Sequence, residues 1–295
     1  MLAELNVNFP VRAHRISLAE FPSSARATIE LSEGHHRTYQ SDGETIDLDT
    51  VISVWWRRPE RCELPPVYHG IDRTFVAAEC DHFVTGLLWS LDCLWINSPL
   101  YEPAASRKVQ QLTIARQLGL RIPRTIVTSN PDAASNFLKS LGRGSVFKRV
   151  GASPGPFCQT TRLTKDWLPR LRTITSCPTI FQEYIEPIAD YRIVWLDGQL
   201  WPFEIDATSS SIPEDTRLDP ALPCRLTSFD AGLCALLYKL MRALNLLFGV
   251  LDLRLGIDGN MYFFEVNPAG QFAYLEDRTG VPLIRALATR LARGK

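Results

Sequence analysis

The 295-residue sequence lacks an excess of charge of either sign. It contains 32 lysines plus arginines and 32 aspartates plus glutamates, so its formal net charge is zero. General nucleic-acid binders usually carry a basic surplus, and this balance argues against a nucleic-acid partner. No apolar run approaches the roughly 20 residues needed to span a bilayer, and no charged-then-apolar signal opens the chain. We therefore expect no membrane partner and a cytoplasmic location.

Metal-binding and disulfide patterns are missing as well. The seven cysteines are odd in number and no pair forms Cys-x-x-Cys, which argues against a zinc site; we expect reduced, mostly buried thiols. The five histidines show no metal-ligand spacing. What is present is ordinary for a globular protein: 45% hydrophobic and 22% charged residues, in a chain long enough to bury a sizeable core.

Strand and helix patterns are mixed along the chain. The first 97 residues are predicted to form a small α/β unit. Its helical pattern at 71–91 has Phe75, Ala78, Phe83, Leu87 and Leu88 as core candidates. Two Asp-Gly turns, at 197–198 and 258–259, each separate two strand-like runs and predict hairpins. The class expected is α/β with α+β layers and largely antiparallel sheets. The other expected helices are 102–118, 132–141, 229–247 and 282–292, and the other strands 28–31, 51–56, 122–128, 179–184, 191–196 and 199–205.

Three oxygen ligands lie near the ends of the second predicted hairpin. They are Asp252, Glu265 and Asn267, and the last two are two residues apart, so they share a strand face. Carboxylate and amide oxygens suit Mg²⁺, which is usually bound together with phosphate oxygens. We expect Glu265 to face solvent and metal rather than the core. The alternative is an ordinary amphipathic hairpin with exposed acids.

Cationic and glycine-rich features precede this hairpin. Lys108 falls in a helical pattern, and Lys148 stands at the tip of an apolar strand. The glycine- and proline-punctuated segment 151–156 follows Lys148, and such a loop can offer backbone N–H groups to phosphate. Asp190 and Arg192 come later on one predicted strand, where i and i+2 neighbours share a face. A structural salt bridge between these two is therefore the alternative to a catalytic role for Arg192.

Taken in order, these residues resemble the ATP-grasp ligases from about residue 97 to 293. Trp55-Trp56-Arg57-Arg58-Pro59 is similar to the Trp-x-Arg-Arg-Pro signature of the microviridin-type (graspetide) peptide macrocyclases. The run from Asn267 to Phe272 is similar to their Asn-Pro-x-Gly-Gln-aromatic ending. Asp215-Thr216-Arg217 stands near the place where that family carries Asp-Trp-Arg, and Thr216 departs from the pattern in a region of peptide docking.

The resemblance implies an ATP-grasp fold behind a small pre-ATP-grasp domain, divided as 1–97, 98–178 and 179–295. It implies ATP and Mg²⁺ as cofactors and activation of a carboxylate as an acyl phosphate. The product would be ester or amide side-chain crosslinks, macrolactones or macrolactams, in a ribosomally made precursor peptide. The expected partner is that precursor with its leader segment, while a homodimer, and the choice between ester and amide, stay open.

The resemblance also implies roles for individual residues. Those expected to act in catalysis are Arg192, Lys148 and Arg217; those expected to bind metal are Asp252, Glu265 and Asn267. Those expected to bind the nucleotide are Lys108, Lys148, Gln182, Glu183, Tyr184, Ile185, Glu186 and Asp190. Substrate contacts are expected from Arg57, Arg58 and Arg217. Strand alternation sends Arg57 and Arg58 to opposite faces, and which of them meets the substrate is undecided. Trp55 and Trp56 are expected in the core.

Two other functions stay open on the sequence alone. One is an ATP-grasp ligase that joins an amino acid to a small molecule or a protein tail, and the other is a non-catalytic peptide-binding relative. Residues 15–22 match a region that follows an opening strand and helix in the resembled family. The first domain is therefore either trimmed or begins upstream of this sequence.

Overall fold

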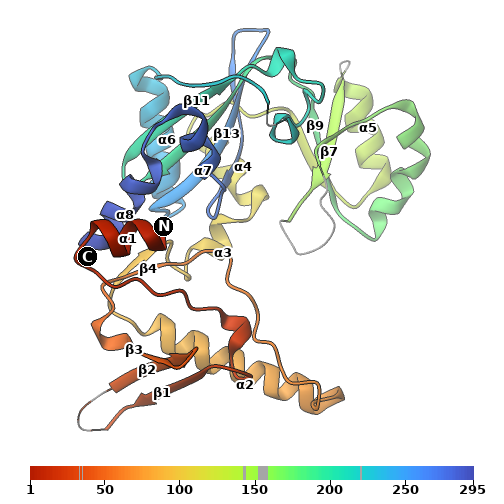
Figure 1. The fold of residues 1–295 in the computed structure, drawn as a ribbon. Helices are drawn as coiled ribbons and strands as arrows, with labels where there is room; N and C mark the ends of the chain where they lie inside the picture. Colours follow the sequence, from red (N-terminus) through yellow and green to blue (C-terminus); the bar gives the residue numbers. More distant parts are fainter. Residues whose placement is uncertain (33, 35, 142–143, 152–158, 220) are drawn as a thin grey trace. The chain divides into compact units, whose positions relative to one another are not determined.

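The computed structural model of the chain describes residues 1–32, 34, 36–141, 144–151, 159–219 and 221–295. The chain divides into two compact units, one made of Met1–Pro99 with Pro282–Lys295 and the other of Leu100–Val281 (Figure 1). The three-part division 1–97, 98–178 and 179–295 stays a prediction. No helix in the described part of the chain is long and apolar enough to cross a membrane.

The first unit contains two small sheets. Three antiparallel strands form a meander, β1 (Arg26–Glu30), β2 (His36–Ser41) and β3 (Glu44–Asp47). A parallel pair, β4 (Ser53–Trp55) and β5 (Leu94–Ile96), forms the second sheet. The helices of this unit are α1 (Leu2–Asn8), α2 (Gly70–Trp89) and α8 (Leu283–Arg293).

Helix α2 contributes to the core only through its C-terminal half. Val84, Leu87 and Leu88 are buried there, as the spacing predicts for Leu87 and Leu88. The prediction that Phe75, Ala78 and Phe83 belong to the core is wrong, because Ala78 is exposed and the exposed fractions of Phe75 and Phe83 are 64% and 38%. A 20-residue helix is about 30 Å long, and its N-terminal half extends beyond the small sheet (Figure 1). The apolar spacing of α2 therefore continues into its N-terminal half, where no core surface of the described residues lies against the helix.

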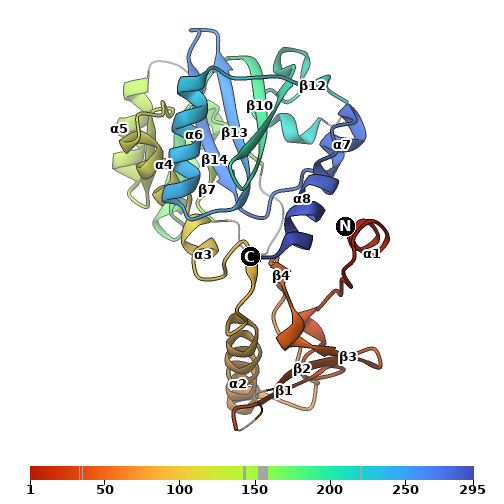
Figure 2. The same cartoon turned by 90° about the vertical axis from the view of Figure 1, so that its left-hand side faces the viewer.

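The second unit is built on a five-stranded antiparallel sheet of order β12-β11-β10-β13-β14. Helices α4 (Lys108–Gln117) and α6 (Ala231–Ala243) cover one face of it (Figure 2). Along β10, Tyr191, Ile193 and Trp195 point to this core, so Asp190 and Arg192 point to the opposite face. The strands are β10 (Pro187–Leu196), β11 (Gln199–Ile205), β12 (Cys224–Leu226), β13 (Phe248–Gly256) and β14 (Met261–Asn267), and α7 (Ala273–Thr279) follows.

A second antiparallel sheet in this unit has the order β6-β9-β7-β8. Helix α5 (Pro131–Leu141) and the 3₁₀ segment Lys165–Thr175 pack on it around Ala134, Phe181 and Leu171. Its strands are β6 (Thr125–Thr128), β7 (Ser145–Arg149), β8 (Thr161–Arg162) and β9 (Thr179–Glu183).

The mixed class and the two hairpins are confirmed. Asp197-Gly198 joins β10 to β11, and Asp258-Gly259 lies between β13 and β14. The single helix expected over 102–118 is instead two helices, α3 (Glu102–Ala105) and α4. The break falls at Arg107, whose backbone is extended, and it makes Lys108 the first residue of α4.

Candidate active site

The register of β13 and β14 brings the predicted metal ligands together. Asp252 is directly opposite Glu265, and Val250 is opposite Asn267. The register shifts after Asp252, between Asp252 and Leu253, which marks a bulge in the ladder at the acidic pair. Asn267 ends β14, and its Oδ1 accepts a hydrogen bond of 3.1 Å from the Ala269 N–H. Three oxygen-bearing side chains thus gather at one end of this strand pair.

Glu265 is held between two cations. The Lys108 Nζ lies 2.8 Å from its Oε2, and the Arg217 Nη1 lies 3.1 Å from its Oε1. Its side chain is only 14% exposed, so the expectation of a solvent-facing Glu265 is wrong. Burial by itself would raise the pKa of Glu265, but Lys108, Lys148 and Arg217 outweigh burial and lower the pKa to about 2. The carboxylate is therefore ionised throughout the physiological range.

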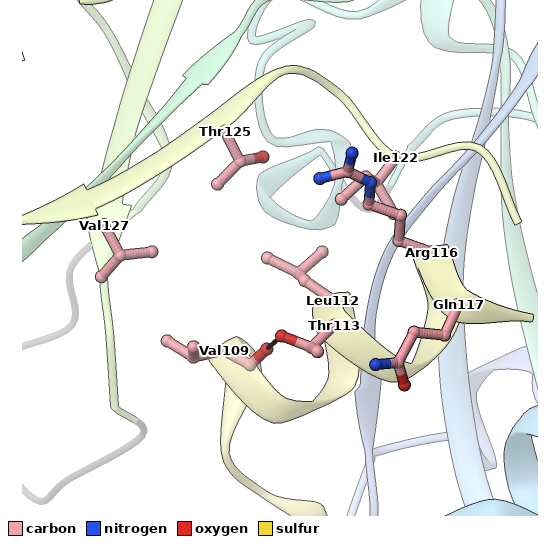
Figure 3. A pocket seen from close by; sticks show the side chains of 8 residues that line it. All are labelled: Val109, Leu112, Thr113, Arg116, Gln117, Ile122, Thr125 and Val127. Carbon is pink, nitrogen blue, oxygen red and sulfur yellow. Dashed lines mark hydrogen bonds between the residues drawn. The ribbon is translucent and has the colours of Figure 1, made fainter.

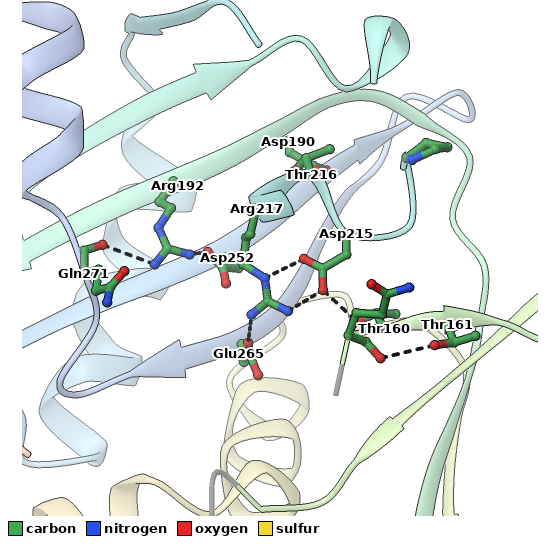
Figure 4. Close-up of polar contacts among 12 residues, drawn as sticks. Thr160, Thr161, Asp190, Arg192, Asp215, Thr216, Arg217, Asp252, Glu265 and Gln271 are labelled. Carbon is green, nitrogen blue, oxygen red and sulfur yellow. Dashed lines mark hydrogen bonds and ion pairs between the residues drawn. The ribbon is translucent and has the colours of Figure 1, made fainter. Parts of the chain in front are cut away.

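Asp252 is balanced by a different cation, Arg192, its register partner on β10. The Arg192 Nη1 donates to Asp252 Oδ1 at 2.8 Å, and its Nη2 donates to the Gln271 carbonyl at 3.2 Å (Figure 4). The alternative, a salt bridge between Arg192 and Asp190, does not form, because Arg192 pairs with Asp252. Burial raises the pKa of Asp252 above its usual range, with Arg192 and Arg217 opposing that rise. The Nε of Arg192 is buried and has no acceptor among the described residues.

Arg217 connects a loop to the sheet. Its Nε and Nη2 donate to both oxygens of Asp215, at 2.6 and 2.7 Å, while its Nη1 reaches Glu265 (Figure 4). Asp215 is 4% exposed and also accepts from the Thr160 N–H at 3.2 Å. Burial would lower the pKa of Arg217, but Asp215, Asp252 and Glu265 raise it, so this guanidinium stays charged. The fork-to-carboxylate contact with Asp215 fixes the plane of the guanidinium.

A second, deeper network supports that loop. The Arg254 Nε and Nη2 donate to the two oxygens of Asp190 at 2.6 and 2.9 Å, and its Nη1 donates to the Ile185 carbonyl at 3.0 Å. The Thr216 hydroxyl donates to Asp190 Oδ2 at 2.6 Å. Arg254 is absent from the residues predicted for the site. Its position two residues after Asp252, and therefore on the same strand face, is the signal that identifies it.

Lys148 lies on β7 and approaches the same carboxylates from the other sheet. Its Nζ is 5.6 Å from the centroid of the Phe264 ring. Burial lowers the pKa of Lys148 to about 8, with Lys108 and Arg217 acting in the same direction and Glu265 and Asp252 opposing them. The structure thus brings Lys108, Lys148 and Arg217 around Glu265. Of the predicted phosphate-binding segment 151–156, residues 152–156 lie outside the described residues.

Most backbone N–H and carbonyl groups at residues 182–186 already form hydrogen bonds within the protein. The Glu183 N–H donates to the Arg124 carbonyl at 2.9 Å, and the Tyr184 N–H donates to the Gly144 carbonyl at 2.8 Å. The carbonyls of Ile185 and Glu186 accept from Arg254 and from the Ile257 N–H. The N–H groups of Ile185 and Glu186 have no backbone acceptor among the described residues, so both remain as donors for a ligand. The Gln182 side chain donates to the Thr125 hydroxyl and is buried.

Two cavities formed by described residues of this unit differ in which part of the candidate site they lie near. One of about 370 Å³ lies beside the 182–186 segment; its lining residues are Gly144, Arg162, Tyr184, Ile185, Glu186, Ile257, Asp258 and Tyr262. The larger one, of about 480 Å³, lies between α4 and β6 and is lined by Val109, Leu112, Thr113, Arg116, Gln117, Ile122, Thr125 and Val127 (Figure 3). None of the site carboxylates lines the larger cavity.

The two arginines of the Trp55–Pro59 signature belong to the first unit. Arg57 is partly buried and its guanidinium carbon lies 5.0 Å from the Trp55 ring centroid, whereas Arg58 is exposed. Trp56 packs edge-on against Trp95, with ring centroids 5.7 Å apart, and belongs to the surroundings of the core.

The donor set fits Mg²⁺. Asp252, Glu265 and Asn267 offer only oxygen atoms, the chemistry that a hard divalent cation prefers. Among the described residues, no hydrogen bond engages Oδ2 of Asp252, and the two partners of Glu265 are long, exchangeable side chains. If Mg²⁺ bound the Glu265 oxygens, the Lys108 amino group would be released to contact phosphate, and the Arg217 Nη1 would be released to contact another anion.

Comparison with known proteins gives a consistent set of structural neighbours. No protein-family model matches the sequence, and no curated protein matches it. The macrocyclase MdnC of Microcystis aeruginosa MRC, solved with the precursor peptide MdnA, superposes with a TM-score of 0.88 at 25% identity, covering 99% of this chain and 94% of that one. The macrocyclase MdnB of the same strain superposes at 0.82 with 26% identity, covering 98% and 93%.

A third neighbour has the same fold at lower sequence identity. It is a Chryseobacterium gregarium ATP-grasp ligase associated with ribosomally made peptides, solved with ADP and a leader and core peptide. It superposes with a TM-score of 0.84 at 23% identity and covers 99% of this chain and 91% of that one. Because these likenesses extend over nearly the whole of each chain, the neighbours share the fold of each unit.

Proposed function

We propose that this chain is an ATP-grasp ligase that closes side-chain rings in a ribosomally made precursor peptide, as its likeness in fold to the macrocyclases MdnC and MdnB supports. The observation that carries this proposal is the facing pair Asp252 and Glu265, surrounded by Lys108, Lys148, Arg192 and Arg217. Two carboxylates for a metal and four cations for phosphoryl groups are the elements that phosphoryl transfer from ATP requires.

The reaction has two steps. A side-chain carboxylate oxygen of the peptide attacks the γ-phosphorus of ATP, the bond to the β,γ-bridging oxygen breaks, and ADP leaves. The resulting acyl phosphate is attacked at its carbonyl carbon by a hydroxyl or amine of the same peptide. Phosphate leaves, the nucleophile loses its proton, and an ester or amide remains. Each ring therefore removes one water from the peptide and converts one ATP to ADP and phosphate.

Negative charge on phosphoryl oxygens grows and moves in both steps, so fixed cations supply most of the stabilisation. Lys108 and Lys148 contact the phosphates of the nucleotide as point charges. Arg192 is held by Asp252 and Gln271, and its Nε, which has no acceptor among the described residues, is available to a transferring phosphoryl group or to the acyl phosphate. Arg217 is fixed by Asp215 and presents its remaining Nη1 at Glu265, where it binds the substrate acid.

The nucleotide base is proposed to bind at residues 182–186, with the N–H groups of Ile185 and Glu186 as main-chain donors. Gln182 and Asp190 act there as supports, because both are already engaged within the fold. Asp252, Glu265 and Asn267 would hold Mg²⁺, which when bound neutralises the phosphate oxygens and orients them. Glu183, Tyr184 and Glu186 complete the walls of the base site.

The peptide substrate is proposed from the neighbours. MdnC is solved with a precursor peptide, and the Chryseobacterium ligase with a leader and a core peptide. We assign to this chain the same class of substrate, a precursor whose leader docks away from the chemistry while its acidic core enters the site. A leader would raise the effective concentration of the core by tethering it.

Mass spectrometry of a candidate precursor with MgATP tests the proposal. The candidate is a short reading frame near the gene, rich in Thr or Ser and in Asp or Glu towards its end. The expected products are a peptide lighter by whole water molecules, and ADP and phosphate in equal amounts, one of each per water lost. Formation of AMP and pyrophosphate, or faster ligation of a free amino acid than of any peptide, would contradict the macrocyclase function and favour a small-molecule ligase.

A further inference from the structure

An arginine that has no hydrogen-bond or ion-pair partner among the described residues stands at the carboxyl ends of two parallel strands in the first unit. β4 ends at Trp55 and β5 ends at Ile96, and the Trp56 N–H continues the pairing by donating to the Ile96 carbonyl at 2.7 Å. Arg57 is the next residue. In sheets with parallel strands, ligands characteristically bind beyond the carboxyl ends, where the chain leaves the ladder and its side chains become available.

The Arg57 side chain is partly buried but makes no hydrogen bond or ion pair with any described residue. Its Nε is fully enclosed and lacks an acceptor. A guanidinium carries five N–H donors, and leaving a buried donor unpaired costs free energy. Arg192, Arg217 and Arg254 behave differently, because each donates to at least one carboxylate. Arg57 is therefore a partly buried cation, with one enclosed N–H, that has no counter-charge among the described residues.

The local structure holds this guanidinium in place. Its central carbon lies 5.0 Å from the centroid of the Trp55 ring, within cation–π distance, so the side chain is oriented without a carboxylate. Burial and the neighbouring Arg58 both lower the pKa of Arg57, which means that an incoming anion would relieve an unfavourable environment. Arg58 itself is exposed and has a left-handed backbone with φ 49°, so the chain turns there and the two arginines do not form a single clamp.

We propose that Arg57 is the cation of a carboxylate-binding subsite in the Met1–Pro99 unit, and that its ligand is an acidic side chain of the peptide substrate. This inference rests on the proposed function and extends it, since it names one substrate contact and separates Arg57 from Arg58. The planar fork of Arg matches a carboxylate with two parallel hydrogen bonds. The indole of Trp55 leaves an apolar wall beside the fork, which suits the methylene groups of a glutamate.

The test measures binding of the full chain to a fluorescein-labelled, end-capped peptide of alternating threonine and glutamate. A second peptide, with glutamine in place of glutamate, measures the part of the binding that does not depend on the carboxylate charge. Arg57→Met keeps most of the apolar stem, Arg57→Lys keeps the charge without the fork, and Arg58→Met is the matched control. Thermal unfolding confirms that each variant is folded, and MgADP affinity is measured in parallel.

Arg57→Met should weaken binding of the glutamate peptide by about 10-fold or more, the scale for a hydrogen bond to a charged group. It should leave binding of the glutamine peptide unchanged. Arg57→Lys should give an intermediate affinity, and Arg58→Met should stay within about twofold of the unmodified protein, as expected for an exposed charge. MgADP affinity should be the same in all of them.

Three results would overturn the subsite: no preference of the unmodified protein for the glutamate peptide, an unchanged affinity in Arg57→Met, or equal losses in Arg57→Met and Arg58→Met. The last result would mean general surface attraction. The proposed function fails in a different way, through loss of MgADP binding or of ADP release in the unmodified protein. If the unmodified protein releases ADP in the presence of a peptide, but Arg57→Met does not change the affinity for the glutamate peptide, the proposed function stands and the subsite is excluded.

Discussion

Asp252 and Glu265 face each other across β13 and β14, yet each carboxylate is balanced by its own cations. Arg192 holds Asp252 from within the same sheet, whereas Lys108 and Arg217 reach Glu265 from a helix and a loop. Two like charges on directly opposite strand positions repel each other, so the pair depends on this surrounding positive charge. The same arrangement explains why Glu265 is mostly shielded from solvent and still ionised.

Glu265→Gln should abolish turnover and leave the protein folded. The substitution keeps the shape of the side chain and removes one anionic oxygen ligand and the partner of Lys108. We expect ADP release in the presence of a peptide substrate to fall by about 100-fold or more, the scale for losing one preorganised charge contact. Glu204→Gln, which removes a carboxylate paired with the exposed Arg225, is the control and should turn over normally. Normal turnover in Glu265→Gln would exclude Glu265 from the metal set.

Nucleotide affinity should depend on the protonation of Lys148. Burial lowers its pKa to about 8, and a bound phosphate favours the charged form and raises that pKa. Affinity for MgADP should therefore be constant below about pH 8 and fall as pH rises above it, by at most about tenfold per pH unit for one proton. Calorimetry across pH 7 to 9.5 measures this. In Lys148→Arg, which stays charged, the fall should disappear; a fall that persists there would assign it to another group.

Thr216→Val should lower turnover without weakening nucleotide binding. The variant removes the hydroxyl that donates to Asp190 and keeps the volume of the side chain, so the loop between Asp215 and Arg217 loses one anchor. A single hydrogen bond contributes about 1 kcal/mol, which corresponds to roughly fivefold in kcat.

Three comparisons separate this positioning effect from general destabilisation. Thr216→Ser should restore turnover, because it keeps the hydroxyl. Thr113→Val removes a hydroxyl that bonds only within its own helix and should have no effect on kcat. If Thr216→Val loses MgADP affinity as much as kcat, or if Thr216→Ser fails to restore it, the hydroxyl does not act by positioning Arg217.

Removing the leader from the precursor should reduce modification strongly, and adding the leader back as a separate peptide should restore only part. Tethering makes the second binding event intramolecular, and a separate leader cannot supply that gain in effective concentration. Rates of water loss for the intact precursor, the leaderless core and the core with added leader measure the effect. Equal rates for the intact precursor and the leaderless core would show that the leader does not contribute to modification.

The sequence predicts the parts of the site that follow strand periodicity and turn chemistry. The Asp-Gly turn and the spacing of Glu265 and Asn267 place the ligands on one hairpin, because alternation along a strand is local information. The Asp190–Arg254 pair and the Thr216 anchor depend on residues 26 to 64 positions apart, so no local pattern reports them. The exposure of Phe75 has the same origin, since helical spacing does not reveal how much surface exists to cover it.

The most direct test of the central claim follows oxygen atoms from the peptide to the released phosphate. The side-chain carboxylates of a precursor are labelled with ¹⁸O, and the protein closes rings with unlabelled MgATP in unlabelled water. If a carboxylate oxygen attacks the γ-phosphorus, one labelled oxygen stays on each phosphate released as a ring forms. Mass spectrometry should then find one ¹⁸O in the phosphate for each water lost from the peptide and none in the nucleotide. Label in AMP, or phosphate free of label while rings form, would contradict activation through an acyl phosphate.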